Sequence, residues 1–355
     1  MGTVANPGTP RSFLLKVRDV VMETDDAITI SLEIPDDLNE IFTFSAGQFL
    51  TIAVPSDLTG SVARCYSLSS TPHSGLHQIT VKRTAEGYAS NWLCQNLKPG
   101  HTLRVLPPSG VFTPRDPDRN LLLFAAGSGI TPVISIARTA LERGAAQVVL
   151  FYANRDAQSV IFAKTLRQLA EKHASRFLIV HWLESVQGLP EKSQIQGLAQ
   201  HFPAYDAFVC GPAPFMKATT DALRNAGFPR SRRHQEKFIT LDGNPFDTTL
   251  ESIPVSAAHN NAAGTTFTLE VEIDGKQYLF DDWRGDQVLL EYMESKGIAV
   301  PFSCRKGQCS ACACVLLEGE MKMKHNEVLD EEEIADGIRL ACQSLPVAGK
   351  IRIEY

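Results

Sequence analysis

The first third of the chain alternates short apolar runs with turn-forming residues, a pattern typical of antiparallel β structure. Pro-Asp-Asp at 35–37 and Pro-His-Ser-Gly at 72–75 separate neighbouring runs, and a helical stretch at 88–95 interrupts the series. The runs predicted as strands are 14–20, 27–34, 48–53, 65–69, 78–83 and 102–106. This spacing predicts a small antiparallel β-barrel over residues 10–116.

The following segment alternates apolar strands with amphipathic helices. Residues 121–126 form an uninterrupted apolar run, which a Gly-Ser-Gly turn separates from an amphipathic stretch at 133–141. Further strands are predicted at 147–153, 177–182 and 205–210, and further helices at 160–172, 192–198 and 214–226. Apolar strands that alternate with helices predict a parallel sheet covered on both faces, over residues 117–238.

Residues 239–265 are rich in small and polar residues and have no clear period, so we interpret them as a linker between domains. A smaller mixed domain follows at 266–355. Its predicted elements are strands at 266–273 and 277–281, a helix at 287–295, a cysteine-rich loop and a final strand at 350–355. The 355 residues therefore predict a multidomain protein.

The composition of the chain and its first residues indicate the cellular location of the protein. No apolar stretch approaches the roughly 18–20 residues that a membrane span needs. The first residues also lack the charged and apolar regions of a secretory signal. We therefore expect a cytoplasmic protein with no membrane partner.

Charge is unevenly distributed along the chain. Residues 266–355 contain 17 acidic and 10 basic residues, whereas the remainder contains 23 acidic and 24 basic residues. A neutral body with an acidic C-terminal domain argues against nucleic-acid binding. It is compatible with docking of that domain on a basic protein surface, although a merely solvated acidic domain explains the charge equally well.

The cysteines are the strongest chemical signal. Five of the eight lie in the last 52 residues, and clustering of this kind in a reducing compartment indicates metal or redox chemistry. Cys304, Cys309 and Cys312 have the C-x4-C-x2-C spacing of plant-type [2Fe–2S] sites, and Cys342 supplies the distant fourth thiolate. A zinc site would favour paired C-x2-C knuckles, of which one is present. Cys314 falls outside the pattern and is expected to be a small buried residue.

A second motif lies on a predicted barrel strand. Arg64-Cys-Tyr-Ser resembles the flavin-binding stretch of the ferredoxin–NADP reductase superfamily. Arg64 can pair with a phosphate, Tyr66 can stack on a ligand, and the resemblance implies that the Ser67 hydroxyl reaches flavin N5. Downstream, Gly87 and Ser90 open a helix whose free N–H groups suit a pyrophosphate. The alternative is an ordinary strand with an exposed arginine.

Two glycine-containing loops follow predicted strands in the second domain. Gly127 and Gly129 lie in a turn that ends with Thr131 and Pro132, where the backbone can approach a pyrophosphate closely. The third glycine of the dinucleotide fingerprint is absent, so a plain tight turn stays open. The second loop is Cys210-Gly-Pro, in which the cysteine can equally be an inert buried thiol.

The choice between NADH and NADPH as electron donor depends on the residues that follow another predicted strand of this domain. Asn154, Arg155 and Asp156 lie where an adenosine ribose is read. An acid at this place binds the ribose 2′-hydroxyl of NAD, whereas an arginine can bind the 2′-phosphate of NADP. Both residue types are present, so these residues alone leave the donor open.

Taken together, these motifs resemble the reductase components of multicomponent oxygenases within the ferredoxin–NADP reductase superfamily. The stretches 64–70, 82–93 and 152–156 resemble most the reductases of 3-ketosteroid 9-alpha-hydroxylases. The resemblance implies a flavin barrel, a nicotinamide domain and a β-grasp ferredoxin domain. It also implies FAD and NADH as cofactors. Related reductases of the phthalate dioxygenase type bind FMN, but the turn at Gly87 favours FAD.

The resemblance assigns roles residue by residue. It implies that Ser67, Cys210, Glu236 and Phe238 frame the contact between nicotinamide and flavin. The remaining cofactor-binding residues it implies are Arg64, Tyr66, Val81, Lys82, Arg83, Gly87, Ala89, Ser90, Gly127, Gly129, Thr131, Asn154, Arg155, Asp156, Gly211 and Pro212.

The implied partner is the terminal component of a Rieske-type oxygenase, with a di-iron epoxygenase or a cytochrome P450 as alternatives. The nicotinamide nucleotide is the small-molecule substrate. Glu327 and the acidic residues within 330–336 are candidate docking charges, although a solvated helix face accounts for most of them.

Overall fold

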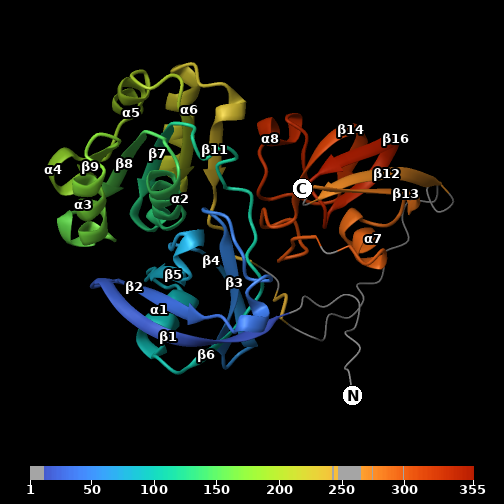
Figure 1. Cartoon of the computed structure of the whole chain (residues 1–355), viewed down its shortest axis with the longest axis horizontal. Coiled ribbons are helices and arrows are strands. Elements are labelled where there is room, and N and C mark those ends of the chain that lie inside the picture. The colour runs from blue at the N-terminus through green and yellow to red at the C-terminus, as the bar shows by residue number, and fades with distance from the viewer. Residues whose placement is uncertain (1–11, 242–243, 247–264, 274, 299) are drawn as a thin grey trace.

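The computed structural model describes residues 12–241, 244–246, 265–273, 275–298 and 300–355. They form three sheets, one for each predicted domain (Figure 1). Among these residues, no helix is long and apolar enough to cross a membrane.

The first sheet is antiparallel and has six strands in the order β4-β3-β6-β1-β2-β5, which confirms the predicted barrel-like domain. Alternation along β1 and β3 places Leu15, Leu50 and Ile52 in a fully buried core, and helix α1 packs against strand β5. The elements are β1 (Phe13–Thr24), β2 (Ala27–Glu33), β3 (Phe49–Ser56), β4 (Gly60–Ser67), β5 (His77–Lys82), α1 (Tyr88–Asn96) and β6 (Thr102–Val105), with 3₁₀ turns at Asp36–Leu38 and Pro72–Ser74.

The second sheet is parallel, as predicted, with strand order β11-β10-β7-β8-β9. The strands are β7 (Leu121–Ala126), β8 (Val148–Asn154), β9 (Phe177–Leu183), β10 (Asp206–Cys210) and β11 (Arg233–Glu236). The helices are α2 (Ile130–Arg143), α3 (Ala163–Lys172), α4 (Glu184–Gln187), α5 (Lys192–Ala199) and α6 (Ala213–Asn225), with 3₁₀ turns at Gly127–Gly129, Ala157–Ser159 and Arg230–Arg232.

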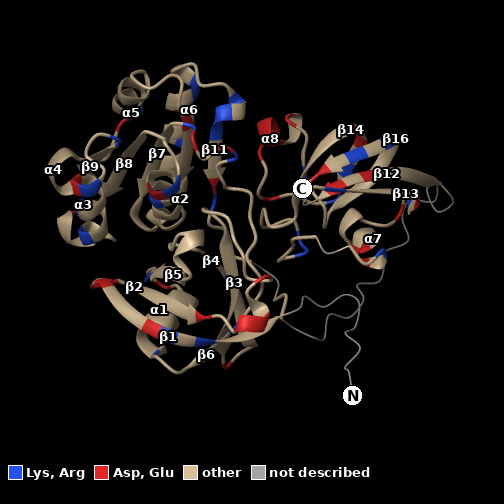
Figure 2. Cartoon of the chain, viewed as in Figure 1, with Lys and Arg blue, Asp and Glu red and all other residues tan. Residues whose placement is uncertain are grey.

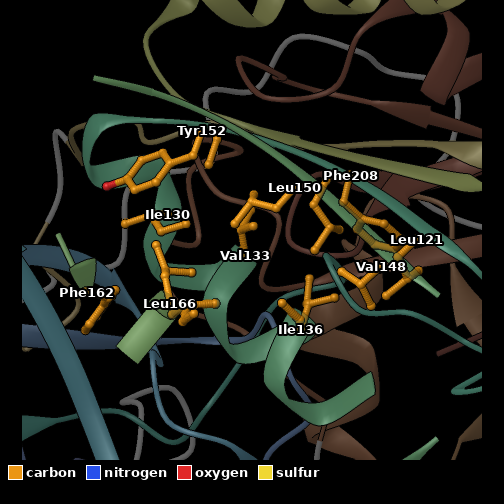
Figure 3. Packing of buried hydrophobic residues seen from close by; sticks show 14 of the residues in the cluster. Leu121, Ile130, Val133, Ile136, Val148, Leu150, Tyr152, Phe162, Leu166 and Phe208 are labelled. Carbon is orange, nitrogen blue, oxygen red and sulfur yellow. The ribbon is translucent and has the colours of Figure 1, made fainter. Parts of the chain in front are cut away.

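Separate apolar clusters cover the two faces of this sheet. On one face, Val133 and Ile136 of α2 pack with Leu150 and Tyr152 of β8 (Figure 3). On the other face, α5 and α6 cover Phe124 and Phe151. Helix α2 begins three residues before the predicted stretch because Pro132 lies in its first turn, where a missing N–H costs no helical hydrogen bond.

The third sheet is mixed, with strand order β13-β12-β16-β14-β15. Strands β12 and β16 are parallel, while the remaining pairs are antiparallel. The elements are β12 (Thr266–Ile273), β13 (Lys276–Arg284), α7 (Leu289–Ser295), β14 (Ala313–Met323), α8 (Glu331–Ala335), β15 (Ile338–Leu340) and β16 (Ser344–Glu354). The sequence pattern predicts neither β14 nor the first half of β16, because register shifts between Leu316 and Met321 disrupt the alternation of buried and exposed residues.

The barrel and the third domain meet through a small apolar cluster. Phe49 and Leu106 of the barrel domain pack there with Leu241, Phe246 and the cysteine loop. Leu241 and Phe246 belong to the predicted linker 239–265, most of which lies outside the described residues. The domain boundaries at 116, 238 and 265 therefore stay predictions.

Candidate redox site at the junction of the three domains

A pocket opens where the three domains meet. Ser67, Glu236 and Phe238, three of the four residues expected to frame the flavin, lie around it together with Cys309 of the predicted cluster loop. The aromatic ring of Phe238 is 49% exposed and offers an apolar face to a planar ligand. The complete lining is Phe49, Cys65, Ser67, Glu236, Lys237, Phe238, Ile239, Gln308, Cys309 and Ser310.

The cysteine loop brings buried thiols together. The Sγ atoms of Cys304 and Cys309 lie 3.2 Å apart, and all four predicted ligands are buried. The backbone N–H groups of Lys306 and Gln308 donate to Cys304 Sγ at 3.4 and 3.3 Å. Hydrogen bonds from the thiols of Cys309 and Cys342, and then these backbone contacts, lower the pKa of Cys304 and favour its thiolate.

The loop backbone explains why small residues are needed here. Gly307 has a φ of 74°, and a Cβ there would lie 2.8 Å from the carbonyl oxygen of His325. The Ser310 hydroxyl is buried and has no hydrogen-bond partner within the described part of the chain, which suits a group bound in the adjoining pocket. No three donor side chains among the described residues are grouped as a single metal ion requires. The thiols nevertheless converge, and a two-iron cluster spreads its four ligands over two metals.

Cys314, which falls outside the cluster spacing, is a buried residue as expected. Its thiol lies 3.6 Å from the carbonyl oxygen of Arg339. Burial raises the pKa of Cys314 well above the ordinary value, so this residue stays a neutral thiol.

The Arg64-Cys-Tyr-Ser stretch forms the end of β4. Ser67 is buried beside the pocket, whereas Tyr66 lies half-buried with its pKa raised mainly by burial. The Arg64 guanidinium donates to the carbonyl oxygen of Ala63 at 2.7 Å and forms no ion pair with any described residue. It is therefore available to a phosphate, which supports its predicted role.

Gly87 precedes α1, as the predicted pyrophosphate turn requires. A Cβ at this position would lie 2.9 Å from both Ser90 Oγ and Thr84 Cβ, so the turn needs a glycine. The Ser90 hydroxyl is engaged locally, since it accepts the backbone N–H of Thr84 at 3.1 Å. Ala89 is buried in the same first turn.

The other residues predicted near the flavin lie at the end of β5. Val81 is fully buried, and the Lys82 ammonium lies 3.7 Å from the Asp26 carboxylate. Arg83 follows directly after the strand, and its backbone N–H donates to the carbonyl oxygen of Asp26. The Lys82 and Arg83 contacts with Asp26 tie this strand end to the β1–β2 hairpin.

Replacement of Arg64 by Ala is expected to weaken flavin binding at least about tenfold, since a charge-assisted hydrogen bond contributes about 1.5–3 kcal/mol. The flavin content of the purified protein, and its loss on dilution, measure this effect. Arg104→Ala is the matched control, because Arg104 is exposed on β6 and makes no ion pair with a described residue. Equal flavin retention in both variants would exclude Arg64 as a flavin ligand.

The two loops predicted to bind the nicotinamide nucleotide lie in close contact. Gly129 packs so tightly that a Cβ would lie 2.2 Å from the carbonyl oxygen of Cys210. Gly211 is similarly confined, since a Cβ there would lie 3.0 Å from both Ala126 Cβ and Phe215 Cδ1. Gly127 instead has open space around it and a φ of 52°, which leaves its backbone accessible.

The flanking residues complete these loops. The Thr131 hydroxyl donates to the carbonyl oxygen of Ser128 at 3.1 Å and so closes the glycine turn. Pro132 lies in the first turn of α2, and Pro212 directly precedes α6. Both loops therefore lie at the carboxyl edge of the parallel sheet, where such sheets bind nucleotides.

The residues expected to read the ribose differ in their environments. Asn154 is buried, and neither its side-chain oxygen nor its nitrogen has a hydrogen-bond partner among the described residues, which suits a bound nucleotide. The nearby Tyr152 hydroxyl donates to the carbonyl oxygen of Gly127 instead. Asp156 accepts from the Ser159 backbone N–H and hydroxyl, and Arg155 pairs with Asp26 of the barrel at 3.1 Å.

Cys210 and Glu236 lie side by side on parallel strands and are both buried. Burial raises the pKa of the Cys210 thiol well above its ordinary value, so this cysteine is not a reactive thiolate. Burial, together with the nearby Glu333 carboxylate, raises the pKa of Glu236 to about 8. Glu236 therefore holds a proton at neutral pH beside the pocket.

Sequence reasoning missed the residues that join the barrel to the cluster loop. The Thr51 and Ser303 hydroxyls lie 2.8 Å apart across this junction, and Thr51 Oγ1 also lies 3.5 Å from Cys65 Sγ. Burial raises the pKa of Cys65 to about 12. Cys65 lies inside the Arg64-Cys-Tyr-Ser stretch, but no feature of the sequence indicates that Thr51 or Ser303 faces it.

The structure places the proposed docking charges in contacts within the chain. Glu327 accepts hydrogen bonds from His325 at 2.6 Å and Gln308 at 3.2 Å. Asp330 caps helix α8 through the Glu333 backbone N–H. The carboxylates at 332, 333 and 336 pair with arginines of the second domain. Apart from Glu331, which is exposed and pairs with no described residue, these candidate charges are therefore engaged within the chain.

Three family models match consecutive parts of the chain. The oxidoreductase FAD-binding domain matches residues 14–113, the oxidoreductase NAD-binding domain residues 123–221, and the 2Fe-2S iron-sulfur cluster binding domain residues 271–347. These matches confirm the expected flavin, nicotinamide and cluster domains in their predicted order.

Over 356 positions the chain is 50% identical to the ferredoxin reductase component of 3-ketosteroid-9-alpha-monooxygenase from Rhodococcus rhodochrous, with 100% of both chains covered. The chain belongs to this family of ferredoxin reductases. The reductase is also 31% identical to a component of the 1,2-phenylacetyl-CoA epoxidase from Escherichia coli, over 96% of this chain and 97% of that chain.

The solved structure of phthalate dioxygenase reductase resembles the reductase in its whole architecture. The TM-score is 0.58, and the match covers 97% of this chain and 98% of that chain at 24% sequence identity. At this identity the likeness establishes the fold, which agrees with the predicted multidomain arrangement.

Proposed function

We propose that the reductase takes electrons from NADH through FAD and its own [2Fe–2S] cluster to a Rieske-type oxygenase that hydroxylates a 3-ketosteroid. The meeting of the Ser67–Glu236–Phe238 pocket with Cys309 supports this proposal most directly. When bound, the flavin would supply hydride acceptance from the nicotinamide, and a cluster held by the four cysteines would supply single-electron transfer onward.

The chain's own residues align these groups and contribute no nucleophile. Arg64 and the helix start after Gly87 would hold the FAD phosphates, and the exposed Phe238 would offer its ring to the flavin. The protonated Glu236 holds a hydrogen-bond donor next to Cys210. Cys304, Cys309, Cys312 and Cys342 would hold the cluster, and the buried loop around them excludes water.

NADH is favoured over NADPH by the state of the residues at the end of β8. Arg155, the candidate partner of a 2′-phosphate, is paired with Asp26 at 3.1 Å. The Asp156 carboxylate lies next to it and would repel a 2′-phosphate. A separate observation favours FAD over FMN. The glycine turn before α1 provides a place for a second phosphate.

The partner is inferred from the relatives. Identity to the steroid monooxygenase reductase is 50%, compared with 31% to the epoxidase component, which favours the steroid oxygenase over a di-iron epoxidase. None of the eight cysteines forms a disulfide, which fits the reducing cytoplasm that we propose as its location.

An anaerobic absorbance titration with NADH, beside one with NADPH, tests the proposal. We expect NADH to bleach the flavin and iron–sulfur bands with uptake of about three electrons per chain, two on the flavin and one on the cluster. Equal rates with NADPH would contradict the assigned donor, and a spectrum without cluster bands would contradict the electron route. Product formation from a 3-ketosteroid after addition of the steroid oxygenase tests the partner.

A further inference from the structure

Helix α8 of the ferredoxin domain faces a basic edge of the nicotinamide domain. Its acidic residues lie opposite the C-terminal end of α6 and the start of β11, and Figure 2 shows this meeting of red and blue segments. The capping residue Asp330 and the first turn of α8 together supply four consecutive acidic residues. Opposite charges therefore meet at a contact between two domains that carry different cofactors.

Glu332 lies at the centre of this contact. Its carboxylate is 2.6 Å from Arg224, 2.9 Å from Arg233 and 3.7 Å from Arg230. Arg233 is buried and bonds Glu332 through Nη2, while its Nε and Nη1 have no hydrogen-bond partner among the described residues. Loss of Glu332 would leave this buried cation without its carboxylate, which makes this pair more consequential than an exposed ion pair.

Further contacts extend the interface on both sides of Glu332. Arg230 lies 3.4 Å from Glu333 and 3.6 Å from Asp336. The Lys237 ammonium donates to the carbonyl oxygen of Val328 at 2.9 Å. The side chain of Gln235 donates to the Asp330 carboxylate, so the alternate residues 233, 235 and 237 of β11 and its exit contact the α8 segment.

These contacts connect to the redox pocket through short stretches of backbone. On the nicotinamide side, Glu236 lies between Gln235 and Lys237 and lines the pocket. On the ferredoxin side, the Glu327 backbone N–H donates to the carbonyl oxygen of Gly307 in the cysteine loop at 3.0 Å. The α8 contact thus fixes the pocket wall and the cysteine loop relative to each other.

We propose that Glu332, together with Arg224, Arg230 and Arg233, positions the ferredoxin domain so that the cluster loop faces the flavin pocket. This inference rests on the proposed function, because it gives the ion-pair cluster a role in the transfer between flavin and cluster. The acidic face of α8 therefore serves docking within the chain. Salt weakens such contacts, so high ionic strength favours separation of the two domains.

Glu332→Gln tests the role in the holoprotein. Hydrogen exchange of residues 230–238 and 326–336 reports whether the contact has opened, and stopped-flow absorbance after mixing with NADH reports flavin and cluster reduction separately. We expect faster exchange in both segments and cluster reduction about threefold to tenfold slower, because each lost pair weakens docking by a modest factor. Flavin reduction by NADH is expected to keep its wild-type rate.

Glu331→Gln is the matched control, because Glu331 lies in the same helix, is exposed and pairs with no described residue. The double variant Arg224→Gln, Glu332→Gln is expected to be less impaired than the two single effects combined, since both remove the same contact. Wild-type exchange or wild-type cluster reduction in Glu332→Gln overturns the inference. If NADH does not reduce the cluster in the wild type, the proposed function is wrong. The hydrogen-exchange data then still show whether Glu332 holds the two domains together.

Discussion

Cys309→Ser is expected to remove the iron–sulfur cluster while leaving the flavin in place. Cys309 Sγ lies 3.2 Å from Cys304 Sγ at the wall of the pocket, so its loss opens the ligand set on the side that faces the flavin. Iron content should fall from about two atoms per chain to nearly zero. NADH-driven cytochrome c reduction should fall about 100-fold or more, since it depends on the cluster.

NADH-driven bleaching of the flavin should persist in this variant, because the residues expected to bind flavin and nicotinamide belong to the other two domains. Cys314→Ser is the control. Cys314 is also buried, but a serine hydroxyl there can donate to the carbonyl oxygen of Arg339, so the cluster should be retained. If Cys309→Ser kept its iron and its electron transfer, the ligand assignment would be wrong.

Local sequence patterns predicted the strands and helices in which the burial of successive residues follows a regular pattern. The run at 121–126 coincides with β7 because all six residues are buried between two layers of helices. Strand β14 was missed because Gly319, with a φ of 86°, and the neighbouring register shifts break the alternation on which a strand prediction depends. Regular burial can be seen in a sequence, whereas a bulge depends on the partner strand.

The residues of the candidate site also fall into two groups, those that a sequence pattern indicates and those that only the fold brings together. The proximity of Cys304 and Cys309 was predictable, because the C-x4-C-x2-C spacing of a rare residue is typical of cluster loops. The Thr51–Ser303 contact joins residues 252 positions apart, and two hydroxyls carry no signal of each other. The pairing of Glu332 with three arginines was also hidden, because an acidic helix has the same sequence whether water or another domain faces it.

Glu236→Gln is expected to stabilise the folded protein at neutral and alkaline pH. Burial raises the pKa of Glu236 to about 8, whereas the same carboxyl in the unfolded chain loses its proton near 4.5. Between these two pH values the folded state holds the proton and the unfolded state does not. Wild-type stability contributed by this group is therefore fully present below pH 4.5 and is lost as the pH rises to 8.

The free energy of unfolding of the wild type falls by about 1.4 kcal/mol for each pH unit above 4.5, which amounts to about 3 kcal/mol by pH 7. Glutamine has the same shape and is neutral in both states, so it avoids this loss and should unfold at a higher temperature than the wild type. Thermal unfolding should show little difference at pH 4.5, a growing advantage of the variant up to pH 8 and a constant one above it. Glu171→Gln, at an exposed site of the same domain, should show no such trend. If the difference in unfolding temperature between the variant and the wild type did not change with pH, Glu236 would already be ionised in the folded protein, with its charge held by another group.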